Sequence, residues 1–452
     1  MKRMFIVWAM AVSFALLWQG CKPSDQPEVD PSQLEALKGT VPVTQDWIFD
    51  SMPEIAVNIQ NPNAVAVKTL VKMRIITDTK TVLEMVEKEV EVPAKKSIDI
   101  TVSPSSPLAP GFYKAAVFVD NAMARNFNFG VNPFEIVSAP DKQPDFDQFW
   151  AKALSELPDL SVAKPVITEI PQKSSANCKV YMVEFQSVPD SPGGEPVVVR
   201  GYYLEPQDGK KHPVIMHFYG YDTLVNPGKV SCPTGGSGNY AEFYLSHRGQ
   251  YINRAPASKR EDGIDRDFSN IYGDWFAFHF GDKDGYYYRG AFMDCVQAVH
   301  FMATRPTSDM GNLFAEGSSQ GGALSYAAAA LSDIPFTAIA PNVAFLGDFP
   351  DYFRIVDWPA SVAKANKGSM TDEEMYAFLS YFDTKNLATR INCAVWATSG
   401  LQDATCPSHT NLAPFNNLPS KDKHMSFYPL MQHSYPPTWT SDIMTFFKER
   451  IK

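Results

Sequence analysis

The sequence is short of positive charge and of cysteine. Of 452 residues, 40 are Lys or Arg and 50 are Asp or Glu, so the formal net charge is -10. Because phosphate binding needs clustered cations, this balance excludes a nucleic-acid partner. The six cysteines show neither CxxC spacing nor the density of a small disulfide scaffold, so we expect no cysteine metal site.

The cysteines also cannot all pair with one another if one of them is modified. Lipidation of Cys21 would leave five, at positions 178, 232, 295, 393 and 406, and at least one of these must then stay free. We expect buried thiols, and the sequence leaves any disulfide pairing open.

The N-terminus has the pattern of an export signal. Lys2 and Arg3 precede an apolar stretch, Met4–Trp18, which is short for a membrane span but typical of a signal-peptide core. It ends in "QGC", before the polar "KPSDQPEVDPS", and resembles a bacterial lipoprotein signal whose Cys21 becomes lipidated, although Trp18 and Gln19 stand where leucine and a small residue are usual. We expect an exported protein, anchored through Cys21 at the periplasmic or cell-surface side; the alternative is ordinary secretion.

The length and the hydrophobic pattern predict two folded parts. At 452 residues, with 45% hydrophobic residues, the chain is too long for one ordinary domain. Segments such as "PEIAVNIQNPN" and "GFYKAAVFVDN" alternate between turn residues, which predicts a small all-β, immunoglobulin-like sandwich. The expected boundaries are a signal peptide over 1–21, a polar tether over 22–45, the sandwich over 46–137 and a catalytic domain over 138–452. For the sandwich, a spacer or packing role is favoured over carbohydrate binding.

The pattern changes after residue 138. Apolar runs such as "HPVIMHF", "CAVWATSG" and "MSFYPL" are typical of strands buried on both faces, and "YRGAFMDCVQAVHFMAT" has helical spacing. Strands that alternate with helices predict a mostly parallel sheet with helices on both faces, as in an α/β-hydrolase fold.

Two adjacent serines lie in "AEGSSQGGALSYAAAAL". A serine nucleophile must protrude at a sharp strand-to-helix turn, and the motif G-x-S-x-G allows that turn because glycines leave the backbone free to pass. Ser319 has Gly317 and Gly321 two places away, whereas Ser318 would have Glu316 and Gln320 there. Ser319 is therefore the candidate nucleophile.

The triad partners follow in the expected chain order. An apolar strand leads to the loop that carries Asp403, and another leads to His433. Of the other downstream histidines, His409 falls in a helical segment and His424 precedes its strand, at the wrong end of the sheet. A helix N-cap role for Asp403 is the structural alternative.

Two backbone N–H groups are expected to stabilise the oxyanion. One is that of Gln320, directly after the nucleophile, and the other is that of Tyr221, in the loop after "HPVIMHF".

Several motifs resemble the acetyl xylan esterase and cephalosporin C deacetylase family of α/β-hydrolases. They are "FYGY", "HRGQ", "YYYRG", "GSSQGG" and "GLQDATCP", in this order, within about residues 140–450. Tyr219, Tyr251 and Gln432 depart from the family pattern, which has a histidine at the first position and glycines at the other two. The resemblance implies a Ser-His-Asp esterase that deacetylates xylo-oligosaccharides or related sugars, without metal or cofactor, often as a homo-oligomer; it places the functional residues at Ser319, Asp403, His433, Tyr221 and Gln320.

The sequence thus predicts a secreted or lipid-anchored serine carboxylesterase whose partner is an acetylated carbohydrate and whose only membrane contact is the anchor at Cys21. Two alternatives stay open. One is an α/β-hydrolase serine peptidase, because a triad does not distinguish esters from amides, and the other is an inactive glycan-binding surface lipoprotein.

Overall fold

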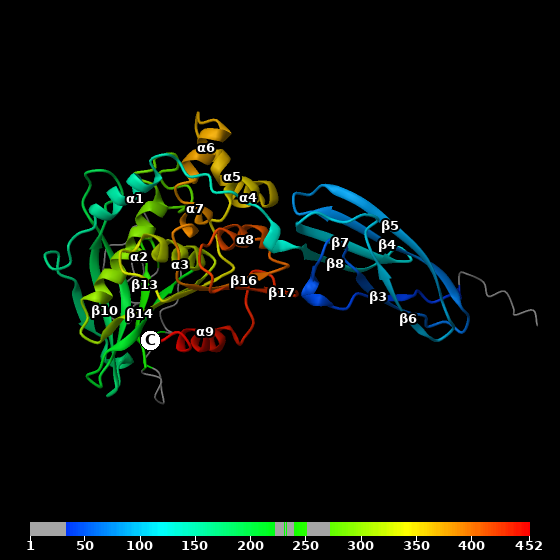
Figure 1. The fold of residues 1–452 in the computed structure, drawn as a ribbon, viewed down its shortest axis with the longest axis horizontal. Coiled ribbons are helices and arrows are strands. Elements are labelled where there is room, and N and C mark those ends of the chain that lie inside the picture. Colours follow the sequence, from blue (N-terminus) through cyan, green and yellow to red (C-terminus); the bar gives the residue numbers. More distant parts are fainter. Residues whose placement is uncertain (1–32, 222–229, 231, 233–238, 251–271) are drawn as a thin grey trace, which may run out of the picture.

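The computed structural model describes residues 33–221, 230, 232, 239–250 and 272–452. The expected signal peptide, Cys21 and Tyr251 lie outside these residues. The described chain forms a β part and a larger α/β part that lie side by side (Figure 1). None of the described helices is long and apolar enough to cross a membrane.

The β part consists of two sheets. One has the order β1-β3-β6, and the other has the order β2-β8-β7-β4-β5. Their bounds are β1 Lys38–Thr40, β2 Ile48–Phe49, β3 Ile55–Gln60, β4 Val67–Thr77, β5 Val82–Val92, β6 Ser97–Val102, β7 Gly111–Val119 and β8 Ala122–Val131. All pairs are antiparallel except β2 with β8. The immunoglobulin-like topology stays a prediction.

The inward faces of these strands are apolar at every second residue. In β3, Ile55, Val57 and Ile59 are buried, as the alternation predicts. The tether expected over residues 22–45 needs a correction, because β1 pairs with β3 and the flanking Leu37 and Val41 are buried in the core. Apolar side chains on both sides of β1 bring this segment into the β part.

The α/β part is built on one sheet of order β17-β16-β15-β14-β12-β13-β11-β10-β9. The six strands from β17 to β13 are parallel to one another, and β11, β10 and β9 continue the sheet antiparallel. The mostly parallel sheet was predicted. The bounds are β9 Val166–Glu169, β10 Cys178–Ser187, β11 Val197–Pro206, β12 His212–Phe218, β13 Ala241–Ser246, β14 Ser308–Ser318, β15 Ala338–Asn342, β16 Ala394–Gly400 and β17 Lys423–Tyr428.

Helices cover both faces of this sheet because its central strands are apolar on both sides. Ile215 and Phe314 pack against Phe447 of the C-terminal helix, whereas Met216 and Ala315 belong to the core cluster on the other face. The helices are α1 Phe146–Ser155, α2 Tyr287–Ala303, α3 Gln320–Leu331, α4 Phe349–Ile355, α5 Asp357–Asn366, α6 Asp372–Leu379, α7 Thr384–Ala388, α8 Ser408–Asn416 and α9 Trp439–Lys448. In Figure 1, α9 lies on the side of the sheet away from α2 and α3.

Candidate active site

Ser319 lies between the end of β14 and the start of α3, in a backbone conformation that side chains rarely adopt. Its φ is 59° and its ψ is -121°. A Cβ on Gly317 would lie 2.4 Å from the carbonyl oxygen of Gly321, and a Cβ on Gly321 would lie 2.1 Å from that of Phe218. Both glycines are therefore required by close backbone contacts, and the turn has the geometry of a nucleophile elbow.

The neighbouring Ser318 has its side chain bound to the sheet. The hydroxyl of Ser318 accepts a hydrogen bond from Nδ2 of Asn342 on the adjacent strand, at 2.8 Å. This bond ties Ser318 to the sheet, so the geometry agrees with the choice of Ser319.

Asp403 and His433 lie together at the carboxyl edge of the sheet. Nδ1 of His433 donates to Oδ2 of Asp403 at 2.7 Å. The Asp403 side chain is fully buried, and the His433 side chain is 30% exposed. The other carboxylate oxygen accepts from the backbone N–H groups of Thr405 and Cys406, at 2.8 and 2.9 Å. Asp403 does not cap α8, whose N-cap is Pro407; its carboxylate holds the loop and the imidazole.

The other two downstream histidines lie elsewhere. His424 is exposed at the start of β17, and its ring contacts Ser426. The imidazole of His409, in α8, lies between the carboxylates of Asp78 and Asp351. Neither ring is placed to serve Ser319, as the strand order predicts.

Cys406, which the sequence analysis did not single out, lies near the side chain of Ser319. Burial raises the pKa of the Cys406 thiol well above its ordinary value, so the thiol is neutral. Among the described residues, Ser319 and His433 form no hydrogen bond with each other. Catalytic hydrogen bonds often form only when substrate is bound.

The loop that carries Tyr221 passes beside the elbow. A Cβ on Gly220 would lie 3.7 Å from Cβ of Ser319, so the two backbones are in near contact. The hydroxyl of Tyr221 donates to Asp274 at 2.7 Å and accepts from the backbone of Trp275 at 3.0 Å, which fixes the loop. The N–H of Gln320 belongs to the first turn of α3 and therefore has no partner within the helix.

A buried network joins three of the sequence motifs behind the elbow. Gln320 accepts from the hydroxyl of Tyr288 at 2.9 Å and donates from Nε2 to Nε2 of His247 at 2.7 Å. Nδ1 of His247 contacts the hydroxyl of Tyr287 at 2.8 Å, and that hydroxyl donates to the carbonyl of Arg248. Burial lowers the pKa of His247 to about 4, so the imidazole is neutral and can accept from Gln320.

Arg248 forms a buried ion pair next to this network. Its guanidinium binds Asp294 through two nitrogens, at 2.6 and 3.0 Å, and Asp190 at 2.6 Å. A Cβ on Gly290 would lie 2.1 Å from Nη1 of Arg248, so this glycine makes room for the guanidinium. Gln250 in turn donates to the carbonyl of Gly220 at 3.0 Å, which connects the pair to the Tyr221 loop.

One group of side chains in the described chain has the composition of a metal site: Asp348, Asp351 and His409. Its ligand atoms are already engaged, because Lys385 donates to Asp348 at 2.9 Å and both ring nitrogens of His409 face carboxylates. The hydrogen bonds that His409 donates to the carboxylates of Asp351 and Asp78 raise its pKa to about 10, despite its burial. A protonated imidazole cannot bind a metal, so we interpret the group as an ion-pair cluster.

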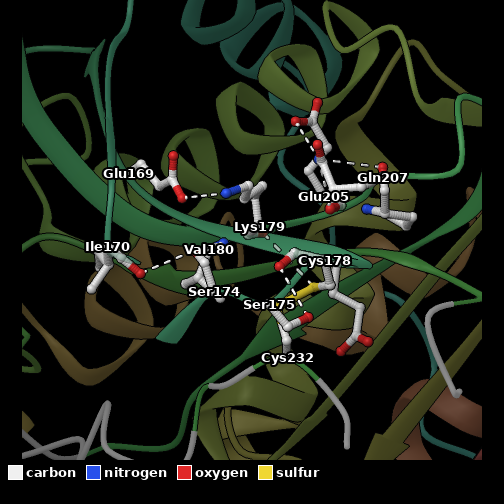
Figure 2. The surroundings of a disulfide bond; sticks show 12 residues. Glu169, Ile170, Ser174, Ser175, Cys178, Lys179, Val180, Glu205, Gln207 and Cys232 are labelled. Carbon is white, nitrogen blue, oxygen red and sulfur yellow. Dashed lines mark hydrogen bonds and ion pairs between the residues drawn. A yellow bond between two sulfur atoms is a disulfide. The ribbon is translucent and has the colours of Figure 1, made fainter. Parts of the chain in front are cut away.

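Two of the cysteines expected as thiols form a disulfide. Cys178, at the start of β10, is bonded to Cys232, 54 residues later (Figure 2). Of the remaining described cysteines, Cys295 and Cys406 are buried and free, and Cys393 is partly exposed and free. The correction has a geometric reason: the fold brings Cys178 and Cys232 into one buried cluster with Tyr202 and Leu204 of β11, and residue spacing does not reveal this.

Comparison with known proteins finds similar esterases. The family model for acetyl xylan esterase (AXE1) matches residues 135–451. Acetyl esterase Axe7A of Xylanibacter ruminicola is 25% identical over 348 residues, which are 76% of this chain and 75% of that protein. The structure of acetyl xylan esterase 1 from Thermoanaerobacterium sp. JW/SL YS485 is similar with a TM-score of 0.57 at 23% identity, over 71% of this chain and 98% of that one. That of an acetyl xylan esterase from Paenibacillus sp. R4 is similar with a TM-score of 0.58 at 24% identity, over 70% and 98%.

Proposed function

The chain belongs to the acetyl xylan esterase family and is a carboxylic ester hydrolase, and we propose that Ser319, His433 and Asp403 are its catalytic triad. The observation that carries the proposal is the 2.7 Å contact between His433 and Asp403 at the sheet edge where the elbow presents Ser319.

In this mechanism, the hydroxyl oxygen of Ser319 attacks the ester carbonyl, and Nε2 of His433 takes the proton of the serine hydroxyl. The Asp403 carboxylate keeps the proton of His433 on Nδ1 and stabilises the imidazolium. The N–H groups of Gln320 and Tyr221 stabilise the oxyanion. The imidazolium then protonates the leaving alcohol, and water that His433 deprotonates hydrolyses the acyl-enzyme.

We propose an acetylated carbohydrate as the substrate, with acetylated xylo-oligosaccharides first. The support is the family match and the acetyl esterase relative. A cavity of about 470 Å³ lies between the β part and the Asp403 loop, lined by Lys80, Lys114 and Asn128 among others, and offers polar groups for the sugar portion.

The replacement Asp403→Asn tests the mechanism. It preserves shape but leaves the imidazole without its negatively charged partner and favours the wrong tautomer, so kcat for p-nitrophenyl acetate should fall by roughly 10⁴. Asp422→Asn, at an exposed aspartate paired with Arg450, is the control and should keep kcat. Equal activity of Asp403→Asn and the wild type would contradict the triad.

Export and anchoring through Cys21 are a second part of the proposal. The disulfide between Cys178 and Cys232 supports it, because disulfides persist in oxidising compartments outside the cytosol. Cys21→Ser should move the protein from the membrane fraction of an expressing bacterium to its soluble exported fraction. If the wild type is not in the membrane fraction, the anchor is wrong.

A further inference from the structure

The β part contacts the loop that carries Asp403. Asn128, in β8, donates from its backbone N–H to Oε1 of Gln402 at 2.8 Å, and its carbonyl accepts from Nε2 of Gln402 at 3.1 Å. Its side-chain Nδ2 donates to the carbonyl of Leu401 at 2.9 Å. The side-chain amide of Gln402 therefore pairs with the backbone of β8 as a neighbouring strand would. Leu401 and Gln402 directly precede Asp403.

The same glutamine also holds the loop that leads to His433. Nε2 of Gln402 donates to the carbonyl of Pro429 at 2.8 Å, and its backbone N–H donates to the carbonyl of Met431 at 2.9 Å. Gln402, in the segment before Asp403, thus bonds two other segments at once: strand β8 and the segment before His433. In Figure 1, the β part lies beside the end of the α/β sheet where β17 is labelled, and β16 and β17 are the strands that these two loops follow.

We propose that the β part positions the catalytic triad, and that Asn128 and Gln402 are the positioning residues through which it does so. The inference rests on the proposed triad. Asn128 lies outside the residues that match the family, 135–451, so a segment added to the family's catalytic part supports its catalytic loops. The His433 side chain is 30% exposed, and loops at the surface are more mobile than the elements that they connect. The bonds through Gln402 therefore help to hold the His433 loop in place.

One other pair of hydrogen bonds across the same boundary does not involve the Asp403 loop. Asn416, in α8, donates to the carbonyls of Ile136 at 3.0 Å and of Pro133 at 3.3 Å. Asn416→Ala therefore weakens the boundary without removing a bond to either triad loop, and it is the matched control for a purely structural role.

Gln402→Met is the main test, because methionine has a similar length but forms none of the three side-chain hydrogen bonds. A displacement of about 1 Å at a catalytic group costs about 10²-fold in rate, so a smaller displacement should lower kcat about tenfold, with KM changed less than twofold. Asn128→Ala removes only the bond to Leu401 and should lower kcat by about twofold to fivefold. Asn416→Ala should keep kcat at the wild-type value, whatever its effect on Tm.

The assay uses the full chain from Lys22 onward. It measures kcat and KM with p-nitrophenyl acetate, Tm by scanning calorimetry, and the rate at which a fluorophosphonate labels Ser319. Labelling needs an activated serine but no particular acyl group or sugar. If the wild type releases no acetate but is labelled faster than Gln402→Met, the proposed substrate is wrong and the positioning role stands.

Three results would overturn the positioning role. One is a kcat of Gln402→Met within twofold of the wild type. Another is that Asn416→Ala loses as much kcat per degree of lowered Tm as Gln402→Met does, because the loss of kcat would then follow stability alone. The third is a wild type that the fluorophosphonate does not label, which would reject the triad and the positioning role together.

Discussion

Replacing Asp294 by asparagine should destabilise the protein through the buried guanidinium of Arg248. That guanidinium and the Asp294 carboxylate are almost completely buried, with side-chain exposures of 1% and 0%. Two of its hydrogen bonds go to Asp294, at 2.6 and 3.0 Å, and the remaining carboxylate partner is Asp190. Water cannot replace the lost charge, and breaking a buried pair of this kind costs about 3–5 kcal/mol. With roughly 2–4 °C for each kcal/mol, Tm should fall by about 6–20 °C.

Scanning calorimetry of the full chain measures this change, with Asp284→Asn as the control. Asp284 pairs with a half-exposed Lys152 at 2.9 Å, and such a surface pair contributes less than about 1 kcal/mol. The double replacement Arg248→Met with Asp294→Leu should recover most of the loss, because it leaves no uncompensated charge. A fall in Tm after Asp294→Asn no larger than that after Asp284→Asn would refute the reasoning.

Three further predictions concern the elbow, the neutral histidine behind it and the disulfide. Gly321→Ala should lower kcat for p-nitrophenyl acetate by at least tenfold, because its Cβ would lie 2.1 Å from a carbonyl oxygen, whereas Gly311→Ala meets only a side-chain oxygen at 3.2 Å and should keep kcat. The pKa of His247 is about 4 in the folded protein and about 6.5 in the unfolded chain, so between these pH values only the unfolded chain gains a proton. Calorimetry should therefore show that about 3 kcal/mol of stability is lost as the pH falls from 6.5 to 4. His247→Gln should lack this part of the pH dependence. Replacing both Cys178 and Cys232 by alanine opens a loop of 54 residues and should cost about 4 kcal/mol in urea unfolding, a cost that added reductant should reproduce in the wild type but not in the variant.

The candidate triad could be predicted because its signals are local. The glycines around Ser319 show the elbow directly, and the strand preceding each of Asp403 and His433 places both residues at one edge of the sheet. Beyond these local signals, predicting the triad needs only the chain order of nucleophile, acid and histidine in the α/β-hydrolase fold.

The supporting contacts could not be predicted because they join distant segments. Asn128 and Gln402 are 274 residues apart, and nothing in the spacing indicates that β8 lies beside the Asp403 loop. The bond between Gln320 and His247 likewise depends on strand order, which places β13 two strands away from β14. From residue type alone, Cys178 and Cys232 were expected to be buried thiols, and their disulfide could not be predicted.

Acetate release from acetylated xylo-oligosaccharides, measured for the chain from Lys22 onward and for its Ser319→Ala variant, tests the central claim most directly. The account predicts release by the wild type and a loss of at least about 10³-fold in the variant, because alanine removes the nucleophile and leaves the fold. Equal release from both proteins would contradict the role of Ser319, and no release from the wild type would contradict the proposed substrate.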